Sequence, residues 1–261
     1  MTISVINHTK DLKDEEVQRV IRAINRQIRE DFEPYWSLGA TLRLEGKTGH
    51  KPGKMSLADM RGDAVLYLWD DLNMDDAVGY HDTNNRGIPF GFVFTALAKE
   101  IGDSWTATFS HEALELIGDP EVNLLSMGPH PKYPERNVFH WYEMCDAVQS
   151  ESYKMDGVEV SNFVLPLYFT SSDEVGGRND FLGRSYRGRT LTSFGVNPGG
   201  YVNFFDPELG VDDTYSHPGD KRAAKVMRVK AKAHEGRRGG RHAVGQPPAP
   251  GAVKGKGQRA R

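Results

Sequence analysis

The chain has one cysteine, Cys145, among its 261 residues, so it cannot form an intrachain disulfide bond. It also lacks any apolar run near the roughly 20 residues that a membrane-spanning helix needs. Its N-terminus has no basic segment followed by an apolar one, and we therefore expect no secretory signal. Together these absences predict a globular protein of the cytoplasm, or of a virion, rather than a secreted or membrane protein.

Charge is distributed unevenly along the chain. Residues 220–261 hold 13 lysines and arginines and two acidic residues, a net charge of +11, whereas the preceding 219 residues carry −14. From about His217 the composition turns to Lys, Arg, Gly, Ala and Pro without a sustained apolar stripe. We therefore expect one folded domain over residues 1–216 and a disordered basic tail over residues 217–261.

The basic tail has two interpretations. Its lysines and arginines could neutralise phosphates and give sequence-independent binding to nucleic acid. Alternatively, it is a solvated segment that folds back on the acidic body. It has no interleaved aromatic residues, so stacking on bases is not indicated.

Hydrophobic periodicity predicts an α+β fold. Val17, Val20, Ile21, Ile24 and Ile28 form the apolar stripe of a helix of about 17 residues that begins at Asp14 and ends near Pro34. The other elements that we expect are strands at Ile3–Ile6, Thr41–Leu44, Ala64–Trp69, Gly79–Asp82 and within Gly87–Phe94, a helix at Ser104–Ile117, a loop at Asn123–Asn137, a strand or helix at His140–Val148, and a hairpin at Tyr153–Val160 that turns at Asp156-Gly157.

The most informative stretch is Ser110–Glu115, in which His111 is followed by Glu112 and, one helical turn on, by Glu115. On a helix, His111 and Glu115 lie about 40° apart, so both can reach one ion. This is the spacing of the H-E-x-x-H zinc-hydrolase motif with a carboxylate in place of the second histidine. Glu112 points about 100° away, where it can act as a general base on a water molecule. The extra carboxylate weakens the Lewis acidity of Zn²⁺ and widens the choice to other divalent metals.

A tetrahedral catalytic site needs a third protein ligand. Glu143 is the first candidate, because Asp146 follows at the spacing that would orient the motif histidine from outside the ligand set. His140 belongs to the same cluster and is a second outer residue. The alternative third ligands are Asp119 and Glu121, the latter ten residues after the motif histidine.

Three further residues could take part in the chemistry: Tyr80, His81 and Cys145. Tyr80 and His81 precede the motif in an extended segment, and we interpret them as substrate contacts; His81 could instead bind metal or form an ordinary hydrogen bond. Cys145 has no partner cysteine and sits among aromatic residues, which favours a packed side chain over a nucleophile.

Several of these segments together resemble zincin-like metallopeptidases, and specifically an uncharacterised family of bacterial and phage proteins. The resemblance covers about residues 3–205. It is carried by Asp31-Phe-x-Pro-x-Trp36, Gly79–Asp82, Gly87–Phe94, Trp105–Glu115 with Asp119-Pro120, Glu143-x-Cys-Asp146, Val158–Pro166 and Gly199–Tyr201.

The resemblance implies a zincin-like fold, in which a mixed twisted sheet, a long N-terminal helix and the motif helix pack together. It implies that His111 and Glu115 bind Zn²⁺, that Glu112 is the base, and that an edge strand within Tyr80–Val93 binds an extended peptide. We thus expect a zinc-dependent, metallopeptidase-like hydrolase acting on peptides or proteins. The alternative is a catalytically inactive zincin fold with a structural or interaction role, phage-encoded, whose tail contacts nucleic acid.

Overall fold

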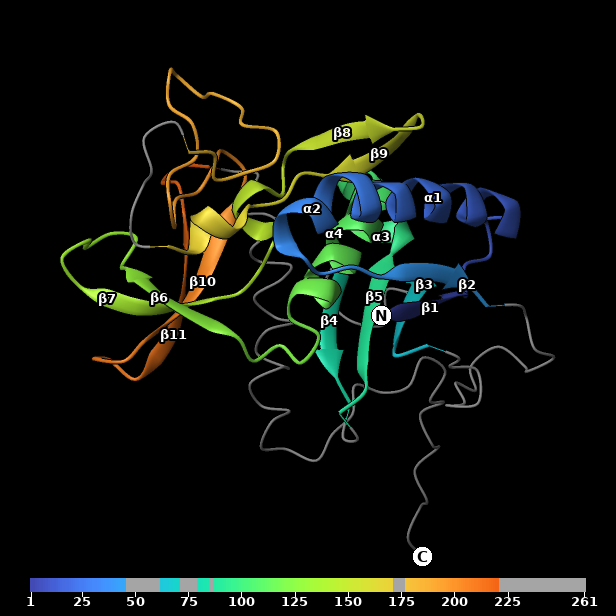
Figure 1. The fold of residues 1–261 in the computed structure, drawn as a ribbon, viewed down its shortest axis with the longest axis horizontal. Coiled ribbons are helices and arrows are strands. Elements are labelled where there is room, and N and C mark those ends of the chain that lie inside the picture. The colour runs from blue at the N-terminus through green and yellow to red at the C-terminus, as the bar shows by residue number, and fades with distance from the viewer. Residues whose placement is uncertain (46–61, 71–78, 85–86, 171–176, 221–261) are drawn as a thin grey trace, which may run out of the picture.

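The computed structural model describes residues 1–45, 62–70, 79–84, 87–170 and 177–220. In Figure 1, α1 lies across a five-stranded sheet, and a four-stranded sheet stands to its side. The elements are β1 (Thr2–Asn7), α1 (Asp14–Gln27), a π-helical turn (Ile28–Phe32), α2 (Glu33–Trp36), β2 (Thr41–Leu44), β3 (Ala64–Trp69), β4 (Gly79–Thr83), β5 (Pro89–Phe94), α3 (Thr95–Ile101), α4 (Trp105–Gly118), β6 (Leu125–Pro129), β7 (Asn137–Trp141), a 3₁₀ turn (Asp146–Val148), β8 (Ser152–Met155), β9 (Val158–Ser161), a second 3₁₀ turn (Pro166–Phe169), β10 (Tyr201–Asp206) and β11 (Val211–Ser216).

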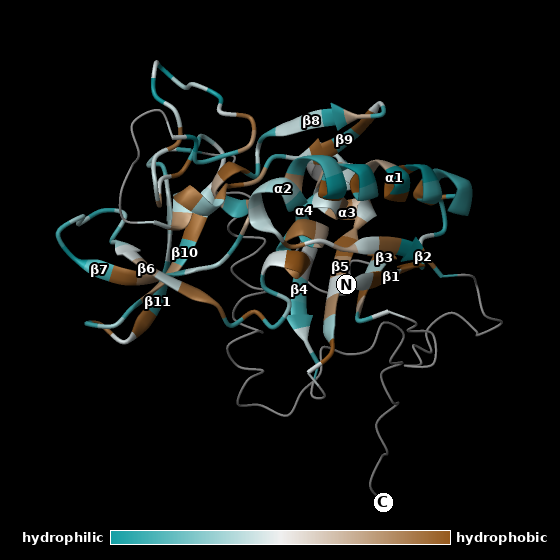
Figure 2. Ribbon diagram, viewed as in Figure 1, coloured by the Kyte–Doolittle hydropathy of each residue, from teal (hydrophilic) through white to brown (hydrophobic). Residues whose placement is uncertain are grey.

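Helix α1 is amphipathic as its sequence predicts. All five residues of the predicted apolar stripe are buried, and the opposite face is charged and exposed. Figure 2 shows this division as hydrophobic residues on one side of α1 and hydrophilic residues on the other. Burying such a stripe against the rest of the core supplies most of the stability of a helix of this length.

The prediction that Pro34 ends the first helix is wrong. The backbone passes through a π-helical turn, in which the Glu33 N–H donates to the Ile28 carbonyl, and then continues as α2. Pro34 lies in the first turn of α2, where its missing N–H costs no hydrogen bond. The helix ends instead at Ser37, whose left-handed backbone has a φ of 53°.

The larger sheet has the strand order β2-β1-β3-β5-β4. β1, β2, β3 and β5 are parallel to their neighbours, and β4 pairs antiparallel with β5, so the sheet is mixed as predicted. One face joins the main core with α1 and α4, through residues such as Val5, Leu66 and Val93. The other face carries a second, aromatic cluster that includes Tyr67 and Phe92.

The edge of this sheet lies beside the motif helix. Of the predicted edge segment Tyr80–Val93, β4 is at the edge, whereas β5 lies inside the sheet between β3 and β4. α4 contacts both strands. The edge strand therefore lies next to the helix that carries the motif.

The smaller sheet corrects one prediction. Its order is β11-β10-β7-β6, all antiparallel, and β6 occupies Leu125–Pro129, inside the segment that we expected to be a loop. The segment at 140–148, predicted as either strand or helix, contains the end of β7 and then the 3₁₀ turn at Asp146–Val148. Helix α3 was not predicted at all.

The predicted hairpin is confirmed as β8 and β9, with Asp156 and Gly157 at φ values of 51° and 78°, the signs that a type I′ turn needs. A buried hydrogen-bond chain fixes this hairpin to both helices. Gln27 of α1 donates to the Ser161 carbonyl and accepts from the Ser110 hydroxyl of α4, and Ser110 accepts from the Ser161 N–H. α4 is thereby held in register against α1 and β9.

The described chain is thus a mixed α and β structure with several sheets and few helices, compatible with the predicted α+β class. Within the described residues, no helix combines the length and apolarity required to cross a membrane. β11 ends at Ser216, and residues 221–261 lie outside the described residues, so the disordered tail stays a prediction.

Candidate metal centre

Helix α4 presents the motif to the interior. Every residue from Phe109 to Gly118 is buried, and His111, Glu112 and Glu115 are 6%, 1% and 3% exposed. The helix is apolar around most of its circumference because β4, β5 and β9 contact it from several sides. Ionisable side chains in such a place are costly unless they are paired or bind a cation.

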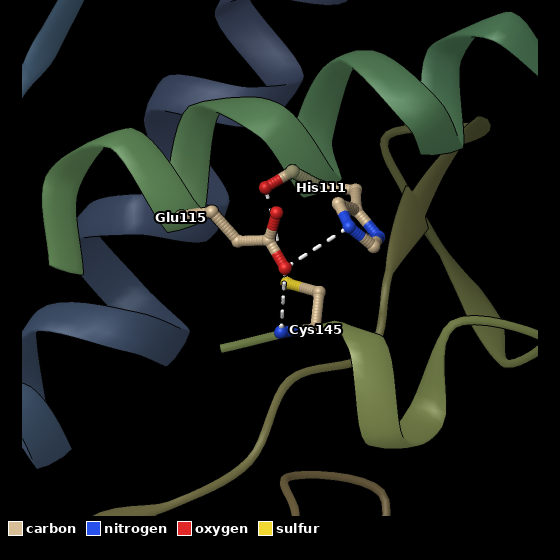
Figure 3. Close-up of side chains that lie close together, drawn as sticks. All are labelled: His111, Glu115 and Cys145. Carbon is tan, nitrogen blue, oxygen red and sulfur yellow. Dashed lines mark hydrogen bonds and ion pairs between the residues drawn. The ribbon is translucent and has the colours of Figure 1, made fainter. Parts of the chain in front are cut away.

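Two carboxylates approach His111. Its Nε2 lies 3.0 Å from Glu115 Oε1, one helical turn on, and 3.3 Å from Asp146 Oδ1, at the start of the 3₁₀ turn. The Cys145 N–H also donates to Glu115 Oε1, at 3.3 Å. Figure 3 shows His111, Glu115 and Cys145 converging in this way. Asp146 thus faces the same nitrogen of His111 as Glu115 does, whereas a residue that orients the motif histidine from outside the ligand set would face the other ring nitrogen, Nδ1.

His81 reaches the same cluster from the edge strand β4. It is 1% exposed, and its Nδ1 lies 3.7 Å from Glu112 Oε2 and 3.8 Å from Glu115 Oε2. The two oxygens of Glu115 therefore face different histidines, His111 on one side and His81 on the other. We interpreted His81 first as a substrate contact; the structure places it among the metal-binding candidates.

Gly79 allows this close approach of strand and helix. A Cβ atom at this position would lie 2.4 Å from Glu112 Oε1, well inside van der Waals contact. The glycine thus leaves the space that the Glu112 carboxylate occupies.

Among the described residues, the ligand atoms form two groups within 4.8 Å of one another: His111, Glu115 and Cys145, and His81, Glu115 and Glu143. Imidazole, carboxylate and thiolate are the ligands that zinc prefers. Four buried carboxylates lie in or beside these two groups, those of Glu112, Glu115, Glu143 and Asp146. A divalent cation would offset their negative charge. The donor set therefore fits a zinc-like ion, with Glu115 common to both groups. The predicted set of His111, Glu115 and Glu143 is divided between them.

The alternative third ligands lie elsewhere. Asp119 caps the end of α4, where its carboxylate accepts from the N–H groups of Asn123 and Leu124. Glu121 is exposed and accepts from the Asn123 side chain. Neither carboxylate belongs to the two groups above. The prediction for Tyr80 concerns a side chain outside the described part of the chain.

His140 is buried in the smaller sheet instead. Its Nε2 lies 2.9 Å from the Pro129 carbonyl oxygen, and its ring packs 4.6 Å from that of Phe194. Burial lowers the pKa of His140 from 6.5 to about 4. The structure does not bring this predicted outer residue into either ligand group.

This shift makes a prediction about acid stability. Between pH 6.5 and about 4, His140 is protonated in the unfolded chain but neutral in the folded chain. The free energy of unfolding therefore falls as the pH is lowered through this window. The full shift corresponds to about 3 kcal/mol. In chemical denaturation at pH 7 and pH 4, His140→Gln should lose less stability than the wild type, because glutamine keeps an N–H donor and does not titrate. Equal losses in both proteins would contradict this assignment.

A pocket of about 300 Å³ opens beside the cluster, with His111 and Glu112 in its wall. The rest of the wall comes from Gly79 of β4, from the turn between α3 and α4 and the first turn of α4, from β8 and β9, and from Gln149 and Ser150. Sequence reasoning missed these residues, because they carry no motif and meet only through the packing of β9 on α4. A small molecule or side chain in this pocket would touch the predicted base.

Comparisons with known proteins give no family for this chain. No family model, curated protein or solved structure matches it.

Proposed function

We propose that the cluster around α4 binds a divalent metal ion, zinc first, and that the protein is a metal-dependent hydrolase of peptide bonds. The observation that carries this proposal is that Glu115 lies at ligand spacing from His111 and Cys145 on one side and from His81 and Glu143 on the other, beside an open pocket. Several buried carboxylates seldom lie this close together unless a cation or a basic side chain neutralises them.

Each residue has a role in this proposal. His111 and Glu115 would hold the ion together with Cys145 in one group, and Glu115 would hold it with His81 and Glu143 in the other. Asp146, whose Oδ1 lies 3.3 Å from His111 Nε2, would add negative charge beside the ion. The ion supplies Lewis acidity, which polarises the scissile carbonyl and makes water easier to deprotonate.

Glu112 is the proposed general base. Its carboxylate lines the pocket and lies close to His81 without belonging to either ligand group. It would take the proton from the attacking water and pass it to the leaving amine nitrogen. The edge strand β4, next to α4, offers backbone groups for an extended peptide, in keeping with the resemblance to zincin-like metallopeptidases.

Proteolysis of unfolded casein tests the hydrolase. We expect the purified protein to cleave casein, to lose this activity in a chelator, and to regain it with Zn²⁺ or another divalent metal. A control protein carrying His111→Ala should stay inactive after metal is restored. Cleavage that is indifferent to the chelator would contradict the proposal.

The charge of the C-terminal segment supports a second, separate proposal, that the tail contacts nucleic acid. Its net charge of +11 over residues 220–261 follows a body of −14. We expect deletion of residues 221–261 to weaken binding to double-stranded DNA at least tenfold, and to flatten its dependence on salt. Fluorescence anisotropy at two salt concentrations measures both. Binding that is unchanged in the shortened chain would contradict this role.

A further inference from the structure

The pocket beside the cluster has an acidic and hydroxyl-rich wall. Two acidic residues line it, Asp103 in the turn before α4 and Glu159 on β9. The lining residues with hydroxyl groups are Ser104, Thr108, Ser150, Ser152 and Ser161. None of the described residues that line the pocket is a lysine or an arginine, and the aliphatic side chains are limited to Ala107. Such a wall has little to offer a large apolar group, but it provides several acceptors for a cation.

The Glu159 carboxylate is held in place rather than loose on the surface. The Ser152 hydroxyl donates to its Oε1 from the neighbouring strand β8. The backbone of Glu159 is fixed too, because the Thr106 hydroxyl in the first turn of α4 donates to its carbonyl oxygen at 2.7 Å. A carboxylate positioned in this way loses little conformational entropy when a ligand binds.

One feature opposes a cation. Ser104, the N-cap residue of α4, lies in the pocket wall. A helix N-terminus carries about half a positive charge. Asp103 and Glu159 together carry up to two negative charges, which is more than the half charge of the helix end. Lys154 is the cross-strand partner of Glu159 but does not line the pocket, so acidic side chains outnumber basic ones among the described lining residues.

We propose that this pocket binds the cationic side chain of a lysine or arginine close to the scissile bond of a peptide substrate, with Glu159 as the specificity-determining residue. The pocket volume of about 300 Å³ is enough for such a side chain. His111 and Glu112 in the same wall place the occupied pocket next to the proposed reactive centre. This inference rests on the proposed function and names the substrate class of that site.

Peptides that differ at one position test this. We would measure kcat/KM for alanine-rich octapeptides in which Lys, Arg, Leu or Glu is placed in turn on each side of the bond. The wild type should prefer Lys or Arg over Glu by about 10- to 100-fold at one position, the effect of a charged hydrogen bond. Glu159→Gln should reduce this preference tenfold or more, and Glu159→Lys should reverse it towards Glu. Glu15→Gln, an exposed carboxylate on α1, is the matched control.

Equilibrium binding of the same peptides, with metal removed by a chelator, separates the two proposals. Selective binding of the Lys peptide that Glu159→Gln abolishes supports the pocket, even if no peptide is cleaved and the hydrolase proposal fails. A preference for Leu or Glu peptides, or a Lys preference that survives Glu159→Gln, overturns the pocket proposal whether or not cleavage occurs. A preference for Glu would indicate that the N-terminus of α4 dominates.

Discussion

Replacing Glu112 with glutamine is expected to lower kcat/KM for peptide hydrolysis by about 10²- to 10⁴-fold, the usual contribution of a general base. Glutamine keeps the size of the side chain but cannot accept the proton from water. Glu112 lies outside both ligand groups, so the variant should bind metal as the wild type does. Steady-state kinetics with a cleavable peptide and elemental analysis of the same sample measure the two effects.

The control for Glu112→Gln is Glu121→Gln, a change at an exposed carboxylate outside the cluster, which should leave kcat/KM within a factor of two or so. Full activity in Glu112→Gln would remove the general-base assignment. Loss of metal from this variant would instead mean that Glu112 is itself a metal ligand. Its Oε2 lies 3.7 Å from Nδ1 of His81, a residue of one ligand group.

Gly79→Ala is expected to have the second-largest effect, through a single methyl group. Its Cβ would lie 2.4 Å from Glu112 Oε1 and 2.8 Å from Glu112 Cδ, so the carboxylate must move away. A displacement of about 1 Å in a reacting group can cost 100-fold in rate. We therefore expect kcat/KM to fall by about 100-fold, with the fold retained, because the clashing atoms belong to the end of a flexible side chain.

The double variant Gly79→Ala/Glu112→Gln shows whether the methyl group acts through Glu112. If it does, the double variant should be no less active than Glu112→Gln alone, since the effects of residues that act together do not add. A further large loss in the double variant would mean that Gly79→Ala distorts β4 itself. Circular dichroism and thermal unfolding of each protein check that the fold survives.

Local patterns predicted the elements in which sequence and packing agree. The stripe from Val17 to Ile28 and the Asp156-Gly157 turn each satisfy one geometric rule, and both are confirmed. The prediction at Pro34 was wrong because a π-helical turn precedes this proline, and the proline then lies in the first turn of α2. β6 was missed because the prolines of this segment, Pro129, Pro131 and Pro134, indicate a loop. β6 is nevertheless an edge strand, where a proline is tolerated.

The cluster could be predicted only in part. The spacing of His111 and Glu115 is a property of a single helix, and the structure brings Nε2 of one to 3.0 Å from Oε1 of the other. His81 and Glu143 lie about thirty residues away in each direction along the chain. They reach Glu115 only because β4 packs beside α4 and because the chain turns back before the 3₁₀ turn. Such long-range placement follows from the fold, and no local pattern encodes it.

Metal stoichiometry tests the account most directly. After incubation with Zn²⁺ and gel filtration, we expect elemental analysis to find at least one ion bound per wild-type chain, and a large loss in His111→Ala and in Glu115→Ala. His140→Gln, a buried histidine outside the ligand groups, should keep the wild-type amount. Absence of bound Zn²⁺ and of any other divalent metal from the folded wild-type protein, or full retention in Glu115→Ala, would contradict the account.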